Sequence, residues 1–149
     1  EEGYNTMAGW YAPHGLYQPQ EVGGLSVTRF AEAVRAEGSL CSPGINKPLH
    51  IHPLLTEADI YGHDRPTRIA HTQRDLIHEQ GSLPVAETIG AFTYSIPWFK
   101  HYRPAVIAEH ANAFRKVAEQ YAELLPDDPG NDPELNSWPV LQRAGRTTA

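Results

Sequence analysis

The stretch RPAVIAEHANAFRKVAEQYAELL, residues 103–125, decides the fold class. Its apolar side chains recur at intervals of four, three, four, three and four residues, the pattern of an α-helix with one buried face. Pro104 is compatible with the first turn of a helix, and Pro126 would end one. We therefore predict an amphipathic helix over residues 103–125. Its core-facing positions are Ile107, Ala111, Phe114, Ala118, Tyr121 and Leu125.

A second helix is predicted from Ser26 to Gly38. Ser26 is a good N-cap, because its hydroxyl can accept a hydrogen bond from a backbone N–H of the first turn. Leu25 stands where a hydrophobic staple would contact Phe30. Gly38 can adopt the left-handed conformation that ends many helices. This helix is expected to pack through Phe30 and Val34.

Short strand-like pieces surround these helices. Residues 6–17 are aromatic and poor in charge, residues 39–42 precede Pro43, and residues 91–97 alternate as a strand does. Proline near the start and glycine near the end indicate a short helix at 83–90. Together these elements predict an α+β, two-layer fold in which helices pack on a small antiparallel sheet.

The length allows one domain, which we expect to comprise residues 1–125. Residues 56–81 show no regular period and are expected to form a binding loop or a mobile one. Residues 126–149 contain four prolines and little apolar material, so we expect an extended or poorly ordered tail, with Trp138 able to dock on the body or on a neighbour. Because the chain begins at Glu1 and not at a methionine, we expect either a trimmed sequence or a piece of a longer protein.

Charge and cysteine content exclude several classes of protein. Lys and Arg number 12 and Asp and Glu 18, a net charge of −6, so we expect neither nucleic acid nor a membrane surface as a partner. A single cysteine, Cys41, excludes an internal disulfide framework. No apolar run is long enough to span a bilayer. We expect a cytoplasmic protein.

One candidate cluster follows Gly44. Two imidazoles two residues apart on a strand, His50 and His52, would point the same way, and Glu57 could complete a metal site. The spacing resembles the first metal motif of cupins, but the second half of the chain offers a long helix where a second motif should stand. A stand-alone metal- or ligand-binding module built on His50, His52 and Glu57 is therefore the alternative hypothesis. The plainer interpretation is a solvated loop.

Five short motifs occur in a particular order along the chain. They are AEG at 36–38, PLH at 48–50, PVAE at 84–87, IPW at 96–98 and AFRKV at 113–117. Their order resembles the C-terminal region of the DegT/DnrJ/StrS family of sugar and aminocyclitol aminotransferases. The match covers most of this chain but only the last third of a family member.

The resemblance implies the small domain of a fold type I enzyme dependent on pyridoxal phosphate. Such enzymes transfer an amino group from glutamate or glutamine to a keto sugar, often nucleotide-linked, or to a keto-cyclitol. They are homodimers whose large N-terminal domain carries the Schiff-base lysine and most of the phosphate site.

None of the three lysines of this chain stands in the family's lysine motif; they are Lys47, Lys100 and Lys116. We therefore expect no bound cofactor and no activity from this chain alone. By resemblance, Lys47 and His50 approach the substrate, with His52 a weaker candidate. A non-catalytic interaction domain of the same architecture is a third possibility.

Overall fold

The computed structural model describes residues 11–58 and 77–138. Its helices and strands follow in the order β1 (His14–Leu16), α1 (Val27–Ala36), α2 (Pro53–Thr56), α3 (Pro84–Thr88), β2 (Thr93–Ser95) and α4 (Pro104–Glu119). Short 3-10 helices occupy Pro19–Val22, Leu49–Ile51, Ile89–Phe92, Tyr121–Glu123, Leu125–Asp127 and Pro133–Asn136. These residues form a mostly helical domain with a two-stranded antiparallel sheet.

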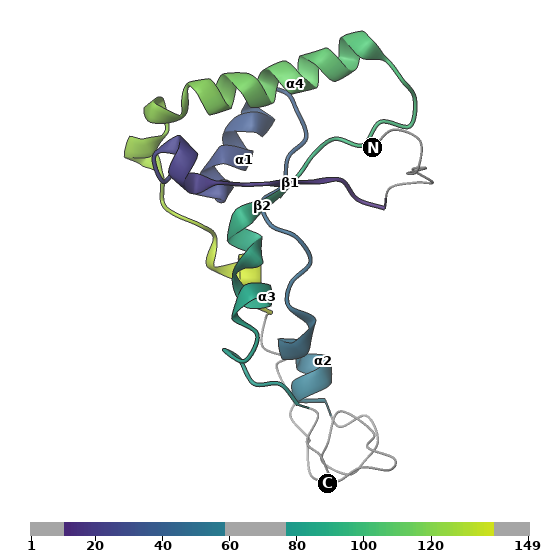
Figure 1. The fold of residues 1–149 in the computed structure, drawn as a ribbon, viewed down its shortest axis with the longest axis vertical. Coiled ribbons are helices and arrows are strands. Elements are labelled where there is room, and N and C mark those ends of the chain that lie inside the picture. Colours follow the sequence, from purple (N-terminus) through teal and green to yellow (C-terminus); the bar gives the residue numbers. More distant parts are fainter. Residues whose placement is uncertain (1–10, 59–76, 139–149) are drawn as a thin grey trace, which may run out of the picture.

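The described chain divides into a body and an arm (Figure 1). The body holds α1, α4 and the sheet. The arm holds α2 and α3 and comprises residues 44–58 and 77–92, which leave the body side by side. Among the helices of residues 11–58 and 77–138, none has both the length and the apolar character needed to cross a bilayer.

The sheet is smaller than the sequence predicts. β1 pairs with β2 so that His14 lies opposite Ser95 and Leu16 opposite Thr93. The strand expected at 6–17 is thus confirmed only for 14–16, and residues 6–10 lie outside the described part of the chain.

The strand predicted at 39–42 is wrong, because only an isolated bridge from Pro43 to Tyr94 forms there. Pro43 has no N–H to donate to a ladder. Residues 42–44 are joined to β2 by two backbone hydrogen bonds instead. The Gly44 N–H donates to the Thr93 carbonyl at 2.8 Å, and the Ser95 N–H donates to the Ser42 carbonyl at 2.9 Å.

Helix α1 confirms the predicted start and end signals. The Ser26 hydroxyl accepts a hydrogen bond from the Arg29 N–H at 3.1 Å. At the other end Gly38 has φ +87°, and the Ser39 N–H donates to the Val34 carbonyl at 3.2 Å, as in a Schellman motif. The buried side chains of α1 are Val27, Phe30, Ala31 and Val34.

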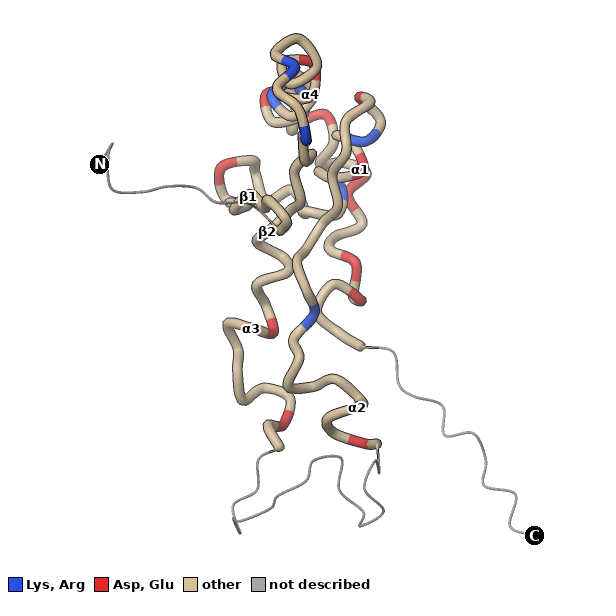
Figure 2. Tube along the Cα trace, turned by 90° about the vertical axis from the view of Figure 1, so that its right-hand side faces the viewer, with Lys and Arg blue, Asp and Glu red and all other residues tan. Residues whose placement is uncertain are grey.

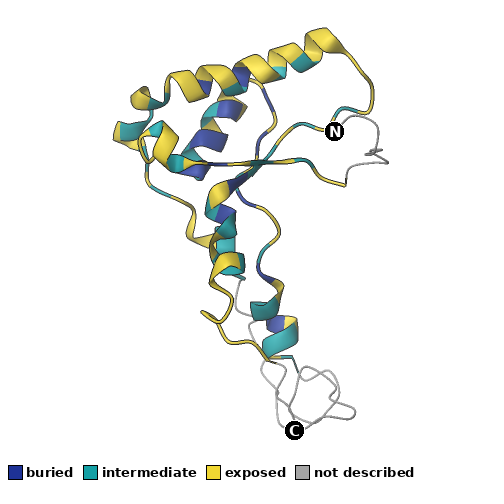
Figure 3. Cartoon of the chain, viewed as in Figure 1, coloured by how far each residue is buried: buried dark blue, intermediate teal, exposed yellow. Residues whose placement is uncertain are grey.

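The buried residues of the body gather on α1, on the facing side of α4 and around the sheet (Figure 3), and Phe30 belongs to this cluster. The ring centroid of Phe30 lies 5.1 Å from that of Tyr17, 5.5 Å from Tyr94 and 6.2 Å from Phe114. These rings come from β1 and its flank, from β2 and from α4. Helix α1 is therefore the middle layer, between the sheet and α4.

Helix α4 differs from its prediction in length and in orientation. It ends at Glu119, and the chain continues as 3-10 turns instead of as one helix to residue 125. Ala113 and Val117 are its buried residues, whereas Ala111 and Ala118 of the predicted stripe are exposed. The buried face therefore runs through Ala113, Phe114 and Val117 and is rotated from the predicted stripe. Helix α1 has 10 residues and α4 has 16, about 15 Å against about 24 Å, so α1 also covers only part of the length of α4.

The C-terminal segment returns to the first turn of α1. The backbone N–H and the hydroxyl of Ser26 donate to the Asp128 carboxylate at 2.7 and 2.6 Å. Val27 N–H donates to Asn131 Oδ1 at 3.0 Å, and Asp132 N–H donates to the Thr28 hydroxyl at 2.9 Å. The prediction of an extended tail is therefore wrong for residues 126–138, while residues 139–149 lie outside the described part.

We expect Asp128→Asn to lower the free energy of unfolding by about 1–3 kcal/mol, because one partner of the Ser26 hydrogen bonds loses its charge. Chemical denaturation measures this change. The matched control is Asp127→Asn, at an exposed neighbouring carboxylate, which should stay within about 0.5 kcal/mol.

The contribution of Asp128 should also depend on pH. Burial raises the pKa of Asp128, but hydrogen bonds from Ser26 and Gly130 and the Arg29 charge lower it more, so the net pKa lies below that of an ordinary Asp. The stability from Asp128 is thus present above the ordinary Asp pKa and is lost as pH falls through the lower folded-state value. A difference in unfolding free energy between wild type and Asp128→Asn that persists in strong acid would contradict this account.

Candidate functional site

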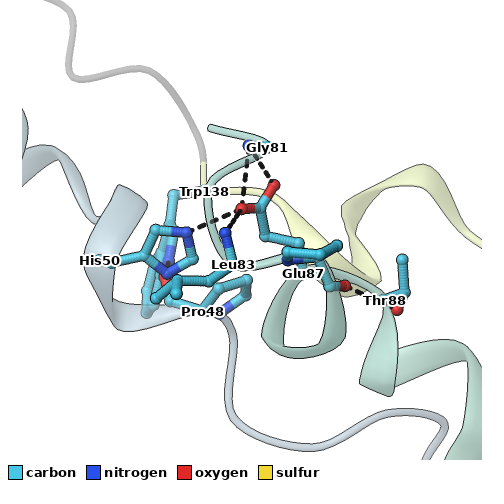
Figure 4. A network of polar contacts seen from close by, with 8 residues as sticks. Pro48, His50, Gly81, Leu83, Glu87, Thr88 and Trp138 are labelled. Carbon is cyan, nitrogen blue, oxygen red and sulfur yellow. Dashed lines mark hydrogen bonds and ion pairs between the residues drawn. The ribbon is translucent and has the colours of Figure 1, made fainter. Parts of the chain in front are cut away.

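The three candidate binding residues lie in one loop of the arm. Two of them, Lys47 and His52, contact Trp138, whereas His50 faces Glu87 (Figure 4). The Lys47 ammonium is 5.8 Å from the centroid of the Trp138 ring, and the His52 ring centroid is 4.1 Å from that of Trp138. The Trp138 indole N–H donates to the Pro48 carbonyl at 2.7 Å. Sequence reasoning placed Trp138 only in a tail able to dock on the body; here it docks on the candidate loop itself.

The loop that carries these residues leaves the edge of the sheet at Gly44. Gly44 has φ +83°, and a Cβ added there would meet the Leu135 side chain at 3.1 Å, so both the backbone conformation and the space favour glycine. Pro48 then precedes the 3-10 turn Leu49–Ile51. His50 lies within this turn, and His52 follows directly after it.

His50 faces Glu87 on α3. Its Nε2 atom lies 2.9 Å from Glu87 Oε1, and the two side chains are only 9% and 13% exposed. The same carboxylate accepts hydrogen bonds from the Gly81 N–H at 2.7 Å and the Leu83 N–H at 3.1 Å. Glu87 therefore joins His50 to the turn that precedes α3.

These donors keep Glu87 ionised. The Gly81 N–H, followed by the His50 side chain, holds the pKa of Glu87 below that of an ordinary Glu, despite partial desolvation. A glutamate on a short helix is also typical of a solvated face, so its residue type alone does not reveal this contact. The signal that could have found Glu87 is the PVAE motif, whose last residue it is.

The arm has one cation among its described residues (Figure 2). Lys47 is the only Lys or Arg within residues 44–58 and 77–92, and the acidic residues there are Glu57, Glu79 and Glu87. No ion pair joins Lys47 to another described residue. Its ammonium charge is thus available to a ligand.

The metal hypothesis gains no support from the geometry. Because a 3-10 turn replaces the assumed strand, His50 and His52 have different neighbours: His50 contacts Glu87, while His52 Nδ1 accepts the Leu54 N–H at 3.0 Å and caps α2. Glu57 is exposed. Among residues 11–58 and 77–138, no three His, Cys, Asp or Glu side chains are placed to hold a metal ion.

Cys41 is not suited to nucleophilic catalysis. It is 2% exposed, and burial raises the pKa of its thiol to about 11, although the nearby Arg35 acts in the opposite direction. A thiol with such a pKa carries almost no thiolate at neutral pH. Cys41 therefore acts as a small buried apolar residue of the core.

Comparison of the chain with protein-family models, with curated proteins and with solved structures gave no match.

We expect the carboxyl group of Glu87 to titrate below the ordinary Glu range, because the Gly81 N–H and His50 favour its charged form. NMR of the side-chain carboxyl carbon as a function of pH measures the midpoint. In His50→Ala the midpoint should rise but remain depressed, since the Gly81 and Leu83 donors stay in place.

The matched control for this titration is the exposed His78→Ala, which should leave the Glu87 midpoint unchanged. The order contributed by Glu87 to the turn at 81–83 should be present at neutral pH and lost as pH falls through the depressed folded-state pKa. An ordinary Glu87 midpoint in the wild-type chain would refute this account.

Proposed function

We propose that this chain is the small-domain part of a pyridoxal-phosphate-dependent aminotransferase that acts on a keto sugar, possibly nucleotide-linked, or on a keto-cyclitol. The observation that carries the proposal is the contact between His50 and Glu87. His50 ends the PLH motif and Glu87 ends the PVAE motif. Two of the motifs on which the family resemblance rests, 37 residues apart in the chain, thus meet through their polar side chains.

The chemistry of the loop fits such a substrate. Lys47 offers a point charge with three N–H donors, which suits a phosphate or a hydroxyl-rich ligand. His50 can donate or accept, but its Nε2 atom already faces Glu87, which leaves Nδ1 as its other polar atom. His52 uses Nδ1 to cap α2 and packs against Trp138, so its role is more structural than that of Lys47.

The residues of this chain do not fit the cofactor itself. The covalent chemistry of pyridoxal phosphate requires a lysine amine held against the cofactor aldehyde. Lys116 is bound to Glu37 at 2.6 Å, Lys100 is exposed beyond β2, and Lys47 lies over Trp138. In the proposed enzyme the large domain supplies this lysine and the cofactor site, and no catalytic step is assigned to the residues described here.

Exposed apolar side chains near the N-terminal half of α4 support a larger parent protein. Trp98 is 59% and Tyr102 85% exposed. Val106 follows in the first turn of α4 and is 37% exposed. Large apolar groups left open to water in this number are typical of surfaces that contact another domain or subunit. In the proposal these are the large domain and the second copy of the homodimer, with glutamate or glutamine as the amino donor.

The decisive measurement is made on the native gene product, purified from its source. We expect an intact mass well above 16.6 kDa, bound pyridoxal phosphate visible by absorbance, and transfer of an amino group from glutamate or glutamine to a keto sugar or keto-cyclitol. The 149-residue chain alone should show neither the absorbance nor the activity. A native product of 16.6 kDa without the cofactor would disprove the proposal.

In that native enzyme, we expect Lys47→Ala to lower kcat/KM for the keto substrate about ten- to hundredfold, the usual effect of losing a charge-assisted hydrogen bond. Lys100→Ala is the matched control, because it removes an exposed lysine outside the arm. Steady-state kinetics with a phosphorylated and an unphosphorylated substrate would show which group Lys47 binds. Equal effects of the two substitutions would exclude Lys47 from the site.

A further inference from the structure

The segment Pro133–Asn136 and the two residues after it contact both limbs of the arm. On one side a Cβ at Gly44 would lie 3.1 Å from Leu135, and the Trp138 indole N–H donates to the Pro48 carbonyl. On the other side the Gly90 N–H donates to Asn136 Oδ1 at 3.1 Å. We call residues 133–138 the strap. It lies beside the 3-10 turn Ile89–Phe92 and reaches the candidate loop through Trp138.

Besides the contact of His50 with Glu87, few interactions hold the loop. No strand in the described part of the chain pairs with residues 45–52, and Pro48 and Pro53 lack N–H groups. The buried residues of the described arm are Gly44, Pro48, Pro53 and Gly90, none of which has a large side chain. The arm therefore lacks a hydrophobic core of its own, and its order must come from individual contacts.

Trp138 is the residue in which these contacts converge. One indole group donates to Pro48, packs against the ring of His52 and lies under the ammonium of Lys47. A cation over an aromatic face and a buried indole hydrogen bond each restrict the group that they contact. Three of the six residues from 47 to 52 are thus fixed by one side chain.

We propose that Trp138 is a positioning residue that fixes the loop 47–52, and with it Lys47 and His50, in the geometry that receives a ligand. The ordering of the loop stands on the contacts described above, whereas the identity of the ligand as a keto sugar rests on the proposed function. Trp138 would affect ligand binding indirectly, by holding Lys47 and the loop backbone in place.

Amide hydrogen exchange on the full 149-residue chain tests the ordering. The reporters are the N–H groups of His52, Leu55 and Glu57, which donate to Leu49, His52 and Pro53. Trp138→Ala should speed their exchange about tenfold, since it removes one hydrogen bond and one ring contact. The amides of α1 and α4 should be unaffected. Trp138→Phe keeps a ring beside His52 but loses the N–H, so a smaller increase is expected.

Trp98→Ala is the matched control, because it removes an exposed tryptophan from the body and should leave the three reporters unchanged. Unchanged exchange of the reporters in Trp138→Ala would overturn the proposal. An equal increase in α1 and α4 would also overturn it, because Trp138 would then act only on global stability. A Trp138→Phe effect as large as that of Trp138→Ala would overturn the role given to the ring.

Kinetics of the native gene product separate this proposal from the proposed function. If that product is an aminotransferase, Trp138→Ala should raise KM for the keto substrate about tenfold and change kcat less than about twofold, because Trp138 orders the loop without touching the reacting atoms. An unchanged KM in an active Trp138→Ala enzyme would overturn the positioning role. Faster exchange of the reporters in a protein without aminotransferase activity would support the strap and count against the proposed function.

Discussion

The two hydrogen bonds from Ser26 to the Asp128 carboxylate join the first turn of the core helix to a residue 102 positions later in the chain. They place a negative charge at the positive end of the α1 dipole and satisfy a backbone N–H that no residue of α1 could reach. The neighbouring Val27 N–H donates to Asn131 Oδ1, and the Thr28 hydroxyl accepts the Asp132 N–H. With the chain held there at residues 128–132, the strap that follows begins beside the body and continues to the arm. The geometry of the candidate site thus depends on a capping interaction in the core.

The body and the arm are stabilised by different means. The body has a continuous apolar cluster in which Phe30 touches aromatic rings from three elements. The arm has no such cluster among its described residues and relies on Glu87, Trp138 and a few backbone hydrogen bonds. Regions of this kind open at a lower free energy than a core does, and ligand-binding loops are commonly drawn from them. The candidate ligand-binding loop therefore lies in a part of the molecule that a small number of contacts keep ordered.

Local signals in the sequence were sufficient for α1, α3 and β2. Ser26 and Gly38 mark α1 by chemistry that acts within a few residues. Features that depend on a distant partner were not predictable in this way. The buried face of α4 runs through Ala113 and Val117, which depends on how α4 packs against the core. The pair His50–His52 diverges because a 3-10 turn stands where a strand was assumed.

The same limit applies to the residues that hold the site together. Lys47, His50 and His52 were substrate-binding candidates by the family resemblance, and in the structure Lys47 and His52 contact Trp138 while His50 contacts Glu87. Glu87 and Trp138, which position them, are 37 and 90 residues away from the loop residues they bind. Glu87 as a charged residue on a short helix is compatible with a solvated face, and Trp138 in a proline-rich segment is compatible with a tail. Only the folded chain shows that each has a partner in the loop.

Glu87 and Trp138 also explain why Lys47 has no carboxylate partner in the described arm. The Glu87 carboxylate already accepts hydrogen bonds from two backbone N–H groups and lies within hydrogen-bond distance of His50. It forms no ion pair with Lys47. Lys47 lies over the ring of Trp138, a contact worth about 0.5–1 kcal/mol at an exposed site, which holds an ammonium without neutralising it. Lys116, in contrast, forms an ion pair with Glu37 at 2.6 Å. Within the described arm, the Glu87 carboxylate thus contacts the His50 imidazole, and the Trp138 indole contacts the Lys47 ammonium. Lys47 therefore keeps an uncompensated positive charge in the same loop as the largely buried His50.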